Sequence, residues 1–525
     1  MNKLNPYDEF LYLGYPFPQT HPDRMATLAT LFGMIPTAVE SSRVLELGCG
    51  DGANLIPMAF GLPGSEFLGI DLAPHAIARG TILLEALGLN NIKLQVRDVL
   101  DVTAELGLFD YIIAHGVYSW VPPVVQNKIL EICKKNLAAQ GVAYVSYNTY
   151  PGGHLRQMVR EMMLFHVRDF HEPQERIGQA RALVKFLSDS QSRSDEYAMF
   201  LKKELDLVLA RADGALYHDD LAVTNAPVYF YQFVEQAAAH GLQYLSEADP
   251  LELKTRGLFP LPTDMFQQSG VNVVVQEQYL DFLKCRRFRQ TLLCHHDVVL
   301  DRTPRPERVK NFYIASSARP LSAAPDIVSA SVVEEFCAAS GAVMSTSNPL
   351  AKAAIVHLGA IWPQGERFDG LVRKAHGLLG DAKNGSLRQR DQEAAALCEL
   401  LSATYGSDVI DLHVHQPSFA TFANDRPVVS PLARLQAQHS HILTTLRHTM
   451  IEVKDDLAKN LVTLLDGTRD RAALVTELTA ALSSGQRNAH IDGASEGAEP
   501  PLSKISFEQL EEKLSELARL ALLVG

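Results

Sequence analysis

The chain has 525 residues, 47% of them hydrophobic and 21% charged, so it is long enough for two to four globular domains. Its formal net charge of −13 gives no positive field that would attract nucleic acid, and we expect no nucleic-acid partner. The first residues carry no apolar signal segment, and no apolar run approaches the roughly 20 residues that span a bilayer, so we expect a cytoplasmic protein without a membrane partner.

Residues 1–42 are expected to form a cap that precedes the first strand. Aromatic residues alternate with prolines in residues 15–22, which suits an extended arm, and a helix is expected over residues 23–32. One interpretation makes this arm a lid over a bound cofactor, which Thr20 and His21 would contact. The other interpretation, equally supported, is an arm that only packs on the sheet.

A short strand followed by a glycine-rich turn is the main signal of the sequence. Residues 43–47 read as a buried strand, and residues 53–62 as the helix after the turn. The turn has the pattern Glu46-x-Gly48-x-Gly50-x-Gly52, and glycine suits a backbone that bends sharply or lies against a ligand. The next strand, residues 67–71, ends in Asp71, and an acid at such a strand end can bind both hydroxyls of a ribose.

Three further strands continue the pattern. Strands are expected at residues 92–96, 109–114 and 141–147, with helices at residues 74–87 and 124–138 between them. This alternation predicts an α/β fold with a parallel sheet. Asp98 follows the third strand, where it either contacts a ligand or only caps a helix.

The glycine turn resembles motif I of the class I S-adenosylmethionine (SAM) methyltransferases. The resemblance implies a Rossmann-like sheet and SAM as the cofactor, with Asp71 on the ribose and Asp98 on the adenine. An NAD-dependent dehydrogenase and a purely structural turn are the competing interpretations. The expected cofactor-binding residues are Glu46, Gly48, Gly50, Gly52, Asn54, Asp71, Leu72, Asp98, Val99 and His115, together with Thr20 and His21 of the arm.

Residues 115–122 hold none of the motifs that base-modifying enzymes place after the fourth strand. The Asp/Asn-Pro-Pro-aromatic motif of amino-methyltransferases is absent there, and so is the Pro-Cys nucleophile of cytosine C5 enzymes. A nucleic-acid base is therefore not the expected methyl acceptor.

The rest of the catalytic fold is interrupted. Residues 154–170 and 174–209 read as long amphipathic helices, and residues of about 155–220 are predicted to be a helical insertion. A helix at residues 230–240 and two antiparallel strands at residues 241–246 and 288–294 then complete the sheet. The insertion is expected to bury its apolar stripe within its own domain, and a homodimer through it is the alternative.

Three segments resemble one bacterial family. They are the arm of residues 15–22, the turn Tyr147-Asn148-Thr149-Tyr150-Pro151-Gly152-Gly153 and the block Arg286-Arg287-Phe288-Arg289-Gln290-Thr291-Leu292. They are similar to class I methyltransferases with a methyltransferase regulatory domain, which include protein-lysine methyltransferases acting on outer-membrane proteins. The resemblance implies N-methylation of lysine in a protein substrate. A small-molecule O- or N-methyltransferase and a SAM-binding regulator without turnover remain alternatives.

Lysine methylation sets the chemistry of the expected catalytic residues. A lysine ammonium must lose its proton before it attacks, burial against aromatic rings favours the neutral form, and the rings can hold the forming methylammonium. The expected catalytic residues are Tyr118, Trp120, Tyr147, Asn148 and Tyr150.

The C-terminal half is expected to recognise the substrate or a partner. Helices are predicted at residues 331–339, 349–360, 368–379 and 388–403, before a strand at residues 409–415. His413 and His415 share the spacing of a metal pair, but no third ligand follows and an exposed strand face explains them better. The six cysteines lack a Cys-x-x-Cys pair, so no metal site is expected.

A helix-turn-helix is predicted at residues 455–465 and 470–482, ahead of a polar loop at residues 483–501 and a closing helix at residues 507–523. It resembles the winged-helix module at the C-terminus of these methyltransferases. Its second helix carries no Lys or Arg up to Leu482, which favours contact with protein over DNA. The predicted domains are residues 1–42, 43–300, 301–425 and 426–525.

Overall fold

The computed structural model describes residues 9–10, 14–190, 195–258, 273–380, 387–489 and 505–524. The chain forms two compact units. Unit 1 comprises Met1–Tyr15, Leu28–Ala59 and Pro63–Arg302, and unit 2 comprises Pro16–Thr27, Phe60–Leu62 and Thr303–Gly525. The expected N-terminal cap of residues 1–42 is therefore divided between the two units.

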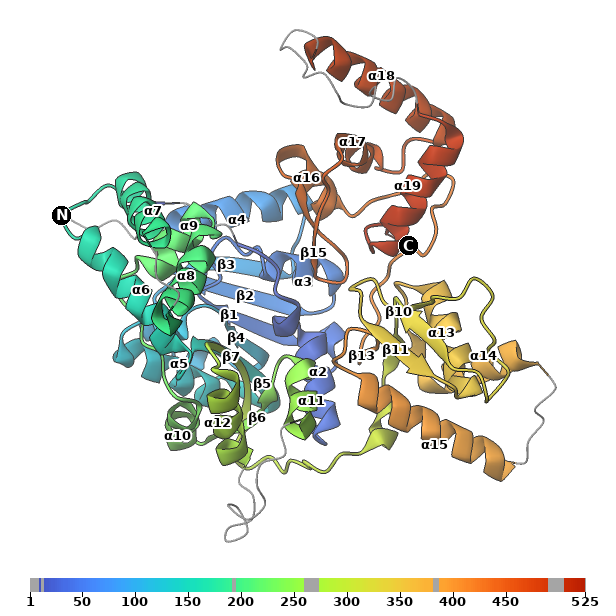
Figure 1. Cartoon of the computed structure of the whole chain (residues 1–525), viewed down its shortest axis with the longest axis horizontal. Helices are drawn as coiled ribbons and strands as arrows, with labels where there is room; N and C mark the ends of the chain where they lie inside the picture. The colour runs from blue at the N-terminus through green and yellow to red at the C-terminus, as the bar shows by residue number, and fades with distance from the viewer. Residues whose placement is uncertain are drawn as a thin grey trace. The chain divides into compact units, whose positions relative to one another are not determined.

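A seven-stranded sheet is the centre of unit 1 (Figure 1). Its strand order is β3-β2-β1-β4-β5-β7-β6, in which β1 to β5 are parallel and β7 runs antiparallel to both of its neighbours. This order confirms the predicted Rossmann-like sheet with its terminal antiparallel pair. The strands are β1 (Arg43–Leu47), β2 (Glu66–Asp71), β3 (Ile92–Val96), β4 (Phe109–Ala114), β5 (Leu137–Asn148), β6 (Leu242–Glu247) and β7 (Phe288–His295).

Helices cover the sheet, and local sequence sets where they begin and end. Helix α4 starts at Pro74, whose missing N–H costs nothing in a first turn, and ends at Gly88, whose φ of 65° is left-handed. Phe233 of α10, Ile129 of α5 and Ile112 of the sheet belong to one buried hydrophobic core. These helices are α3 (Leu55–Gly61), α4 (Pro74–Leu87), α5 (Pro123–Lys135), α10 (Phe230–Ala239), α11 (Pro250–Leu258) and α12 (Val273–Lys284). Helix α2 (Pro22–Leu31) begins in unit 2 and ends in unit 1.

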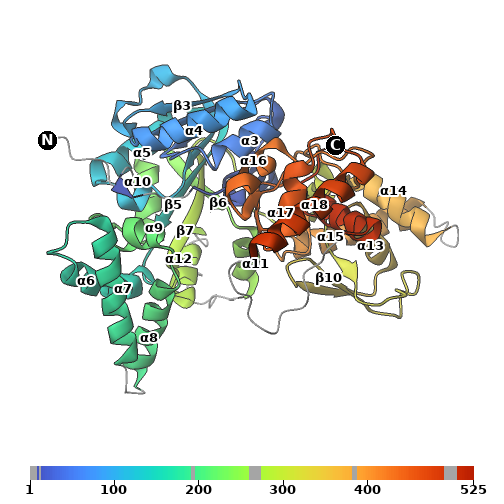
Figure 2. The same ribbon diagram turned by 90° about the horizontal axis from the view of Figure 1, so that it is seen from above.

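The helical insertion has a core of its own. Helices α6 (Gly153–His166), α7 (Pro173–Asp189) and α8 (Glu196–Leu209) lie side by side next to the sheet (Figures 1 and 2). Met163, Val184 and Leu205 meet between them. The expected helical stretch 174–209 is two helices, because Asp195 caps a new helix by accepting a hydrogen bond from the Ala198 N–H at 2.9 Å. The short helix α9 (Asp213–Ala215) and a π-helical turn (Leu216–Asp220) end the insertion.

The first part of unit 2 combines three helices with two small sheets. The predicted helices are confirmed as α13 (Pro349–Ile361), α14 (Phe368–Leu379) and α15 (Leu387–Thr404). The strand orders are β11-β10-β9 and β12-β8-β13. The strands are β8 (Tyr313–Ala315), β9 (Arg319–Pro320), β10 (Glu334–Cys337), β11 (Val343–Thr346), β12 (Glu366–Arg367) and β13 (Asp411–His413).

The helix predicted at residues 331–339 is wrong, because β10 occupies this stretch. Its side chains alternate, with Glu334 and Phe336 buried and Glu335 exposed, which is the period of a strand. Strand β13 is also shorter than residues 409–415, so His415 lies beyond the strand that holds His413.

The second part of unit 2 contains the predicted helix-turn-helix, α17 (Asp456–Leu464) and α18 (Arg471–Ala489). Leu461 and Leu474 of this pair pack with Leu514 of α19 (Phe507–Arg519). Ahead of it lie α16 (Pro431–His439) and a hairpin of β14 (Ile442–Thr444) and β15 (Met450–Glu452), which the sequence did not predict. Helix α18 runs into the expected polar loop 483–501, whose residues from 490 onwards lie outside the described ranges.

Within the described ranges, no helix combines the length and the apolar character that crossing a membrane requires.

Candidate functional site

The glycine-rich turn is tied to the end of strand β2. The N–H groups of Gly48 and Cys49 donate to the Ile70 carbonyl oxygen at 2.8 and 3.1 Å. Gly48 and Gly50 have φ of 73° and 55°, a region that side chains with a Cβ rarely adopt. A Cβ at Gly48 would collide with Val117, whereas one at Gly50 would meet no atom within 4 Å. The turn therefore presents bare backbone to open space at Gly50.

A buried acid lies behind this turn. Glu46 is 4% exposed on β1, and its Oε1 accepts a hydrogen bond from Asn54 Nδ2 at 2.7 Å. Its Oε2 is buried and has no hydrogen-bond partner among the described residues. Burial raises the pKa of Glu46 to about 8. A cationic group of a ligand would stabilise this carboxylate.

Asp71 braces the turn from the end of β2. Its Oδ2 accepts a hydrogen bond from the Gly50 N–H and its Oδ1 from the Ala73 N–H, both at 2.8 Å. Leu72, which lies between Asp71 and Ala73 in the sequence, is 54% exposed. Asp71 is therefore held at the carboxyl end of the sheet, beside the glycine turn.

Asp98 lies at the same edge, because the Arg97 N–H donates to the Asp71 carbonyl oxygen at 2.9 Å. One oxygen of Asp98 accepts from the Leu100 N–H at 2.8 Å and caps the short helix Val99–Asp101. The capping interpretation of Asp98 thus applies to one of its two oxygens. Its contact with adenine stays a prediction.

His115 follows strand β4 at this edge of the sheet. Its Nδ1 lies 2.9 Å from the Tyr144 hydroxyl, and its ring meets the edge of Phe288 at a centroid distance of 6.2 Å. Burial lowers the pKa of His115 to about 4, so the imidazole is neutral at pH 7. A neutral ring adds no positive charge beside a cationic ligand.

Two of the five expected catalytic residues lie in the hydrophobic core. Tyr118 and Tyr147 are 0% and 1% exposed, and Tyr147 stacks on Phe233 at a centroid distance of 4.1 Å. The Tyr118 hydroxyl donates to Gln236, and the Tyr147 hydroxyl lies 3.0 Å from Thr291 Oγ1. Burial raises the pKa of both phenols, so both stay protonated at neutral pH.

The other three expected catalytic residues lie where β5 ends and α6 begins. The Asn148 N–H donates to Ser119 Oγ at 2.8 Å, and Tyr150 stacks on His154 at a centroid distance of 4.0 Å. The Trp120 ring lies 5.8 Å from the Arg156 guanidinium. Asn148 is buried, whereas Trp120 and Tyr150 are partly exposed.

A later segment of the chain, which sequence reasoning missed, joins this group. The Ala226 N–H donates to the Ser119 carbonyl oxygen at 2.8 Å, and the Val228 N–H donates to the Asn148 carbonyl oxygen at 3.2 Å. Asn225 thereby reaches Asn148, whose Nδ2 donates to Asn225 Oδ1 at 2.9 Å. The only sequence signal was the turn around Asn225 ahead of three aromatic residues, Tyr229, Phe230 and Tyr231.

The arm residues Thr20 and His21 belong to unit 2. Thr20 Oγ1 donates to the Phe17 carbonyl oxygen at 2.8 Å, and the His21 ring lies 5.2 Å from the His448 ring. Burial lowers the pKa of His21 to about 4. Their contact with a cofactor stays a prediction.

The histidine pair of unit 2 is held by protein groups. His413 Nδ1 lies 2.6 Å from Asp23 Oδ2, and its Nε2 lies 3.0 Å from Arg447 Nη2. His413 and His415 are partly buried, so the exposed strand face expected for them is wrong. Within the described part of the chain, no group of three or more His, Cys, Asp or Glu residues could hold a metal ion.

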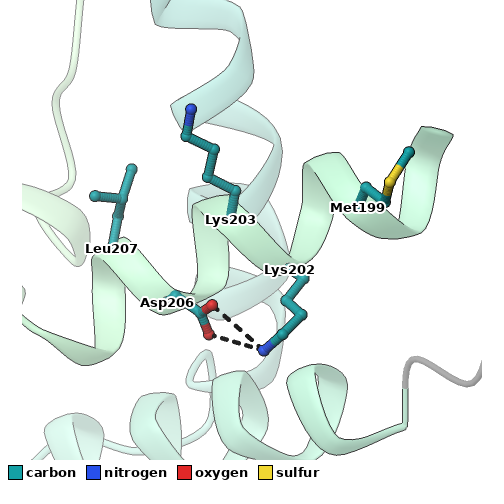
Figure 3. Close-up of a pocket in the computed structure, with 5 residues that line it drawn as sticks. All are labelled: Met199, Lys202, Lys203, Asp206 and Leu207. Carbon is teal, nitrogen blue, oxygen red and sulfur yellow. Dashed lines mark hydrogen bonds and ion pairs between the residues drawn. The ribbon is translucent and has the colours of Figure 1, made fainter. Parts of the chain in front are cut away.

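A shallow surface depression lies along one face of α8, and none of the residues above lines it (Figure 3). Lys202 and Asp206 form an ion pair there at 3.3 Å, with both side chains more than half exposed. The depression is lined by Met199, Lys202, Lys203, Asp206 and Leu207.

Three family models match the chain. A methyltransferase domain matches residues 38–186, a predicted methyltransferase regulatory domain matches residues 212–295, and the C-terminal winged helix domain of PKMT matches residues 425–522. The regulatory-domain match includes the segment that carries Asn225.

Two individual proteins match nearly the whole chain, and a third matches a short stretch of it. The Rickettsia prowazekii protein RP789 is 34% identical over 491 residues, which are 92% of this chain and 87% of that protein. The structure of PKMT2 from Rickettsia typhi in complex with AdoHcy is 30% identical, covers 98% of this chain and all of its own, and has a TM-score of 0.84. Human EEF1A lysine methyltransferase 2 is 40% identical over 87 residues, 16% of this chain and 36% of that protein.

The residues at the glycine turn fit SAM. The open space at Gly50 suits a ligand against the backbone, and the buried Oε2 of Glu46 needs a hydrogen-bond donor such as an amino group. The chain therefore belongs to the family of Rickettsia typhi PKMT2 and is a SAM-dependent methyltransferase with a regulatory domain and a C-terminal winged helix.

Proposed function

We propose that the protein transfers the methyl group of SAM to lysine side chains of a protein substrate. The observation that carries the proposal is the extent of the likeness to AdoHcy-bound PKMT2, which includes the C-terminal half as well as the catalytic sheet. The large C-terminal half, which lies outside the catalytic sheet, favours a macromolecular methyl acceptor over a small molecule. The stretch similar to a human protein named as a lysine methyltransferase adds weaker support.

The cofactor would be held by groups at the carboxyl edge of the sheet. Glu46 and the backbone of Gly48 and Gly50 would bind its amino-acid part, Asp71 the ribose and Asp98 the adenine. Asn54 would keep Glu46 in place through their hydrogen bond. Leu72, Val99 and His115 would line the site, and His115 stays neutral beside a cationic cofactor. SAM itself supplies a methyl group on a sulfonium.

The acceptor lysine needs two things from the chain. Its reference pKa near 10.4 means that it arrives as an ammonium and must lose a proton before it attacks. Partial burial beside Trp120 and Tyr150 would favour the neutral amine, and Asn148 would orient it by a hydrogen bond. Tyr118 and Tyr147 would act by shaping the wall behind these groups.

The experiment that tests this function uses the purified full chain, labelled SAM and a host lysate. Label in protein, recovered as methyl-lysine after complete hydrolysis, supports the proposal. Label only in small molecules would replace it by a small-molecule methyltransferase, and no label would leave a SAM-binding regulator. Heat-treated enzyme in the same lysate measures labelling by host enzymes.

We further propose that the protein works in the cytoplasm and self-associates through the insertion. All six cysteines are unpaired, as expected in a reducing compartment. Phe165, Phe186 and Met199 of the insertion are 70%, 64% and 61% exposed, and large exposed apolar side chains often mark contact surfaces. Light scattering of the wild type and of Phe186→Lys would measure whether a dimer depends on this face.

A further inference from the structure

A row of aromatic side chains starts at the candidate catalytic group and continues over two helices of the regulatory domain. The Tyr150 and Tyr229 rings are 5.2 Å apart, Tyr229 and Tyr231 are 5.8 Å apart, and Phe282 meets Tyr229 edge-on at 6.2 Å. We call Tyr150, Tyr229, Tyr231 and Phe282 the aromatic row. Tyr231 and Phe282 are 39% and 46% exposed, and Tyr150 and Tyr229 are partly buried.

The elements that carry the aromatic row are firmly anchored. Helices α10 and α12 lie side by side (Figure 1), and the Tyr231 N–H donates to Gln278 Oε1 at 3.1 Å. At the start of the row, the Tyr150 N–H donates to the Val228 carbonyl oxygen at 3.3 Å. The exposure of these rings is therefore a property of a rigid surface and does not reflect a loose loop.

The opposite side of α12 explains this rigidity. Arg289 of β7 is fully buried and binds Glu277 and Asp281 of α12 at 3.0 and 2.8 Å. Its guanidinium also lies 3.8 Å from the centre of the Phe230 ring, on α10. Both helices are thus fixed to the sheet from within, while Tyr231 and Phe282 face outwards.

A carboxylate lies at the Tyr150 end of the aromatic row. Asn225 Nδ2 donates to Gln157 Oε1 at 3.1 Å, and Gln157 Nε2 donates to Glu161 Oε1 at 3.0 Å. With the bond from Asn148 to Asn225, a polar chain runs from the end of β5 to the exposed side chain of Glu161. Burial, Tyr229 and Glu161 together raise the pKa of Tyr150, so Glu161 acts on this ring electrostatically.

Three cations near the aromatic row are paired with acids. Arg156 binds Asp220 at 3.0 Å, and Lys284 and Arg286 both bind Glu252 at 2.5 and 2.6 Å. Glu161, in contrast, forms no ion pair with a described residue. Aromatic faces next to an exposed carboxylate that forms no ion pair within the described ranges can attract a cation from outside the chain.

We propose that the aromatic row binds a basic segment of the substrate protein beside the lysine that is methylated. A Lys or Arg side chain of that segment would lie along the faces of Tyr229 and Tyr231, with its charge directed to Glu161. The inference rests on the proposed function, because it names where the protein substrate contacts the chain. It assigns this recognition to Tyr229, Tyr231, Phe282 and Glu161, in addition to the expected catalytic residues.

Binding of a basic peptide to the full chain, saturated with AdoHcy, tests the proposal by calorimetry. The probe is a 12-residue peptide of alternating lysine and glycine, and the comparison peptide has glutamate in place of lysine. The wild type is expected to bind the lysine peptide and not the glutamate peptide. Tyr231→Ala and Phe282→Ala should each weaken binding by about three- to fivefold, the size of one exposed cation–π contact.

Glu161→Gln should weaken binding of the lysine peptide by a similar factor and make it less sensitive to salt. Tyr197→Ala is the matched control, because Tyr197 is a 53% exposed aromatic residue on α8 that lies outside the row. It should bind as the wild type does. AdoHcy affinity, measured on each variant, confirms that the cofactor site is intact.

Two results would overturn the proposal. They are failure of the wild type to bind the lysine peptide, and equal binding by the wild type and the Tyr231→Ala and Phe282→Ala variants. The lysate experiment tests the proposed function separately from the aromatic row. If protein is labelled but the Tyr231→Ala and Phe282→Ala variants bind the lysine peptide as the wild type does, protein-lysine methylation stands and the role of the aromatic row is rejected. If these variants lose binding of the lysine peptide but no protein is labelled, the aromatic row binds basic peptides and protein-lysine methylation is rejected.

Discussion

Asp71 combines two tasks in one side chain, and the first prediction concerns the loss of both. Replacing Asp71 by Ala removes the acceptor of the Gly50 N–H and the proposed partner of the ribose. SAM affinity should fall more than tenfold, or about 1.4 kcal/mol, by calorimetry. Asp101→Ala, which removes a nearby exposed carboxylate, should leave the affinity unchanged. Unchanged affinity in folded Asp71→Ala would remove Asp71 from the cofactor site.

The raised pKa of Glu46 predicts that cofactor binding is coupled to the loss of a proton. Without a ligand, burial raises its pKa from 4.5 to about 8, so at pH 7 it holds a proton. A cationic amino group of SAM would favour the carboxylate, so binding should release a proton and affinity should rise as pH increases from 6 to 8. Calorimetry in buffers of different ionisation enthalpy measures the proton count.

The same shift gives a stability prediction with the opposite slope. Because the folded state of the ligand-free protein binds this proton more tightly than the unfolded state, Glu46 lowers the free energy of unfolding as pH rises from 4.5 to 8. Glu46→Gln should abolish the proton release on binding and flatten this slope. Proton release that persists in Glu46→Gln would assign it to another group.

At the residue scale, the sequence predicted contacts that are local and missed those that are not. Glu46, Asn54 and Asp71 could be placed because a strand, a glycine turn and a second strand put them at one edge. Asn225 and Tyr229 could not, since they reach Asn148 and Tyr150 across about 77 residues of sequence through backbone bonds of Ala226 and Val228. Nothing in the sequence alone distinguished the core tyrosines Tyr118 and Tyr147 from the more accessible Tyr150.

At the element scale, helices and strands were predicted correctly where Gly or Pro residues bound a short apolar run. The strands Arg43–Leu47, Ile92–Val96 and Phe109–Ala114 have the predicted bounds because each is a short apolar stretch between turns. The stretch of β10 was misread as a helix, although its two adjacent valines and its alternation around Phe336 favour a strand. The hairpin β14–β15 has only three residues in each strand, too few for a periodic signal.

The buried ion cluster that anchors α12 carries a prediction at this scale. Arg289 pairs with Glu247 at 2.7 Å as well as with Glu277 and Asp281, and all four side chains are buried. Arg289→Met should lower the free energy of unfolding by about 3–5 kcal/mol, because the buried carboxylates of Glu247, Glu277 and Asp281 would each lose a cationic partner.

Urea unfolding followed by circular dichroism measures the effect of Arg289→Met. Lys202→Met is the control, since its ion pair with Asp206 is more than half exposed and should contribute less than about 1 kcal/mol. A similar small loss in both variants would show that the cluster does not stabilise the fold.

At the scale of the whole molecule, the two units suggest a division of labour. The glycine turn, Asp71 and the aromatic row all belong to unit 1, and we expect residues 303–525 to select the substrate without taking part in methyl transfer. A chain truncated after Arg302 should bind SAM within about threefold of the full chain but lose more than 90% of protein labelling. Circular dichroism must first show that it is folded.

A second truncated chain, residues 28–302, serves as the matched control. The chain truncated after Arg302 keeps Asp23 but removes its partner His413, and the chain of residues 28–302 lacks Asp23 itself. Comparison of their SAM affinities also tests the predicted role of Thr20 and His21. Unchanged kcat/KM for the protein substrate in a folded truncated chain would give unit 2 a role in assembly or regulation.

The membership of Pro16–Thr27 in unit 2 has a consequence for how the chain can be taken apart. The backbone passes from one unit to the other at residues 15–16, 27–28, 59–60, 62–63 and 302–303, so the units share more than one covalent connection. A single protease cut after Arg302 breaks only one of these connections. The two fragments should then elute together in gel filtration, because Asp23 contacts His413 and Arg24 donates a hydrogen bond to Tyr405. A denaturant should separate them by releasing Pro16–Thr27 from the rest of unit 2.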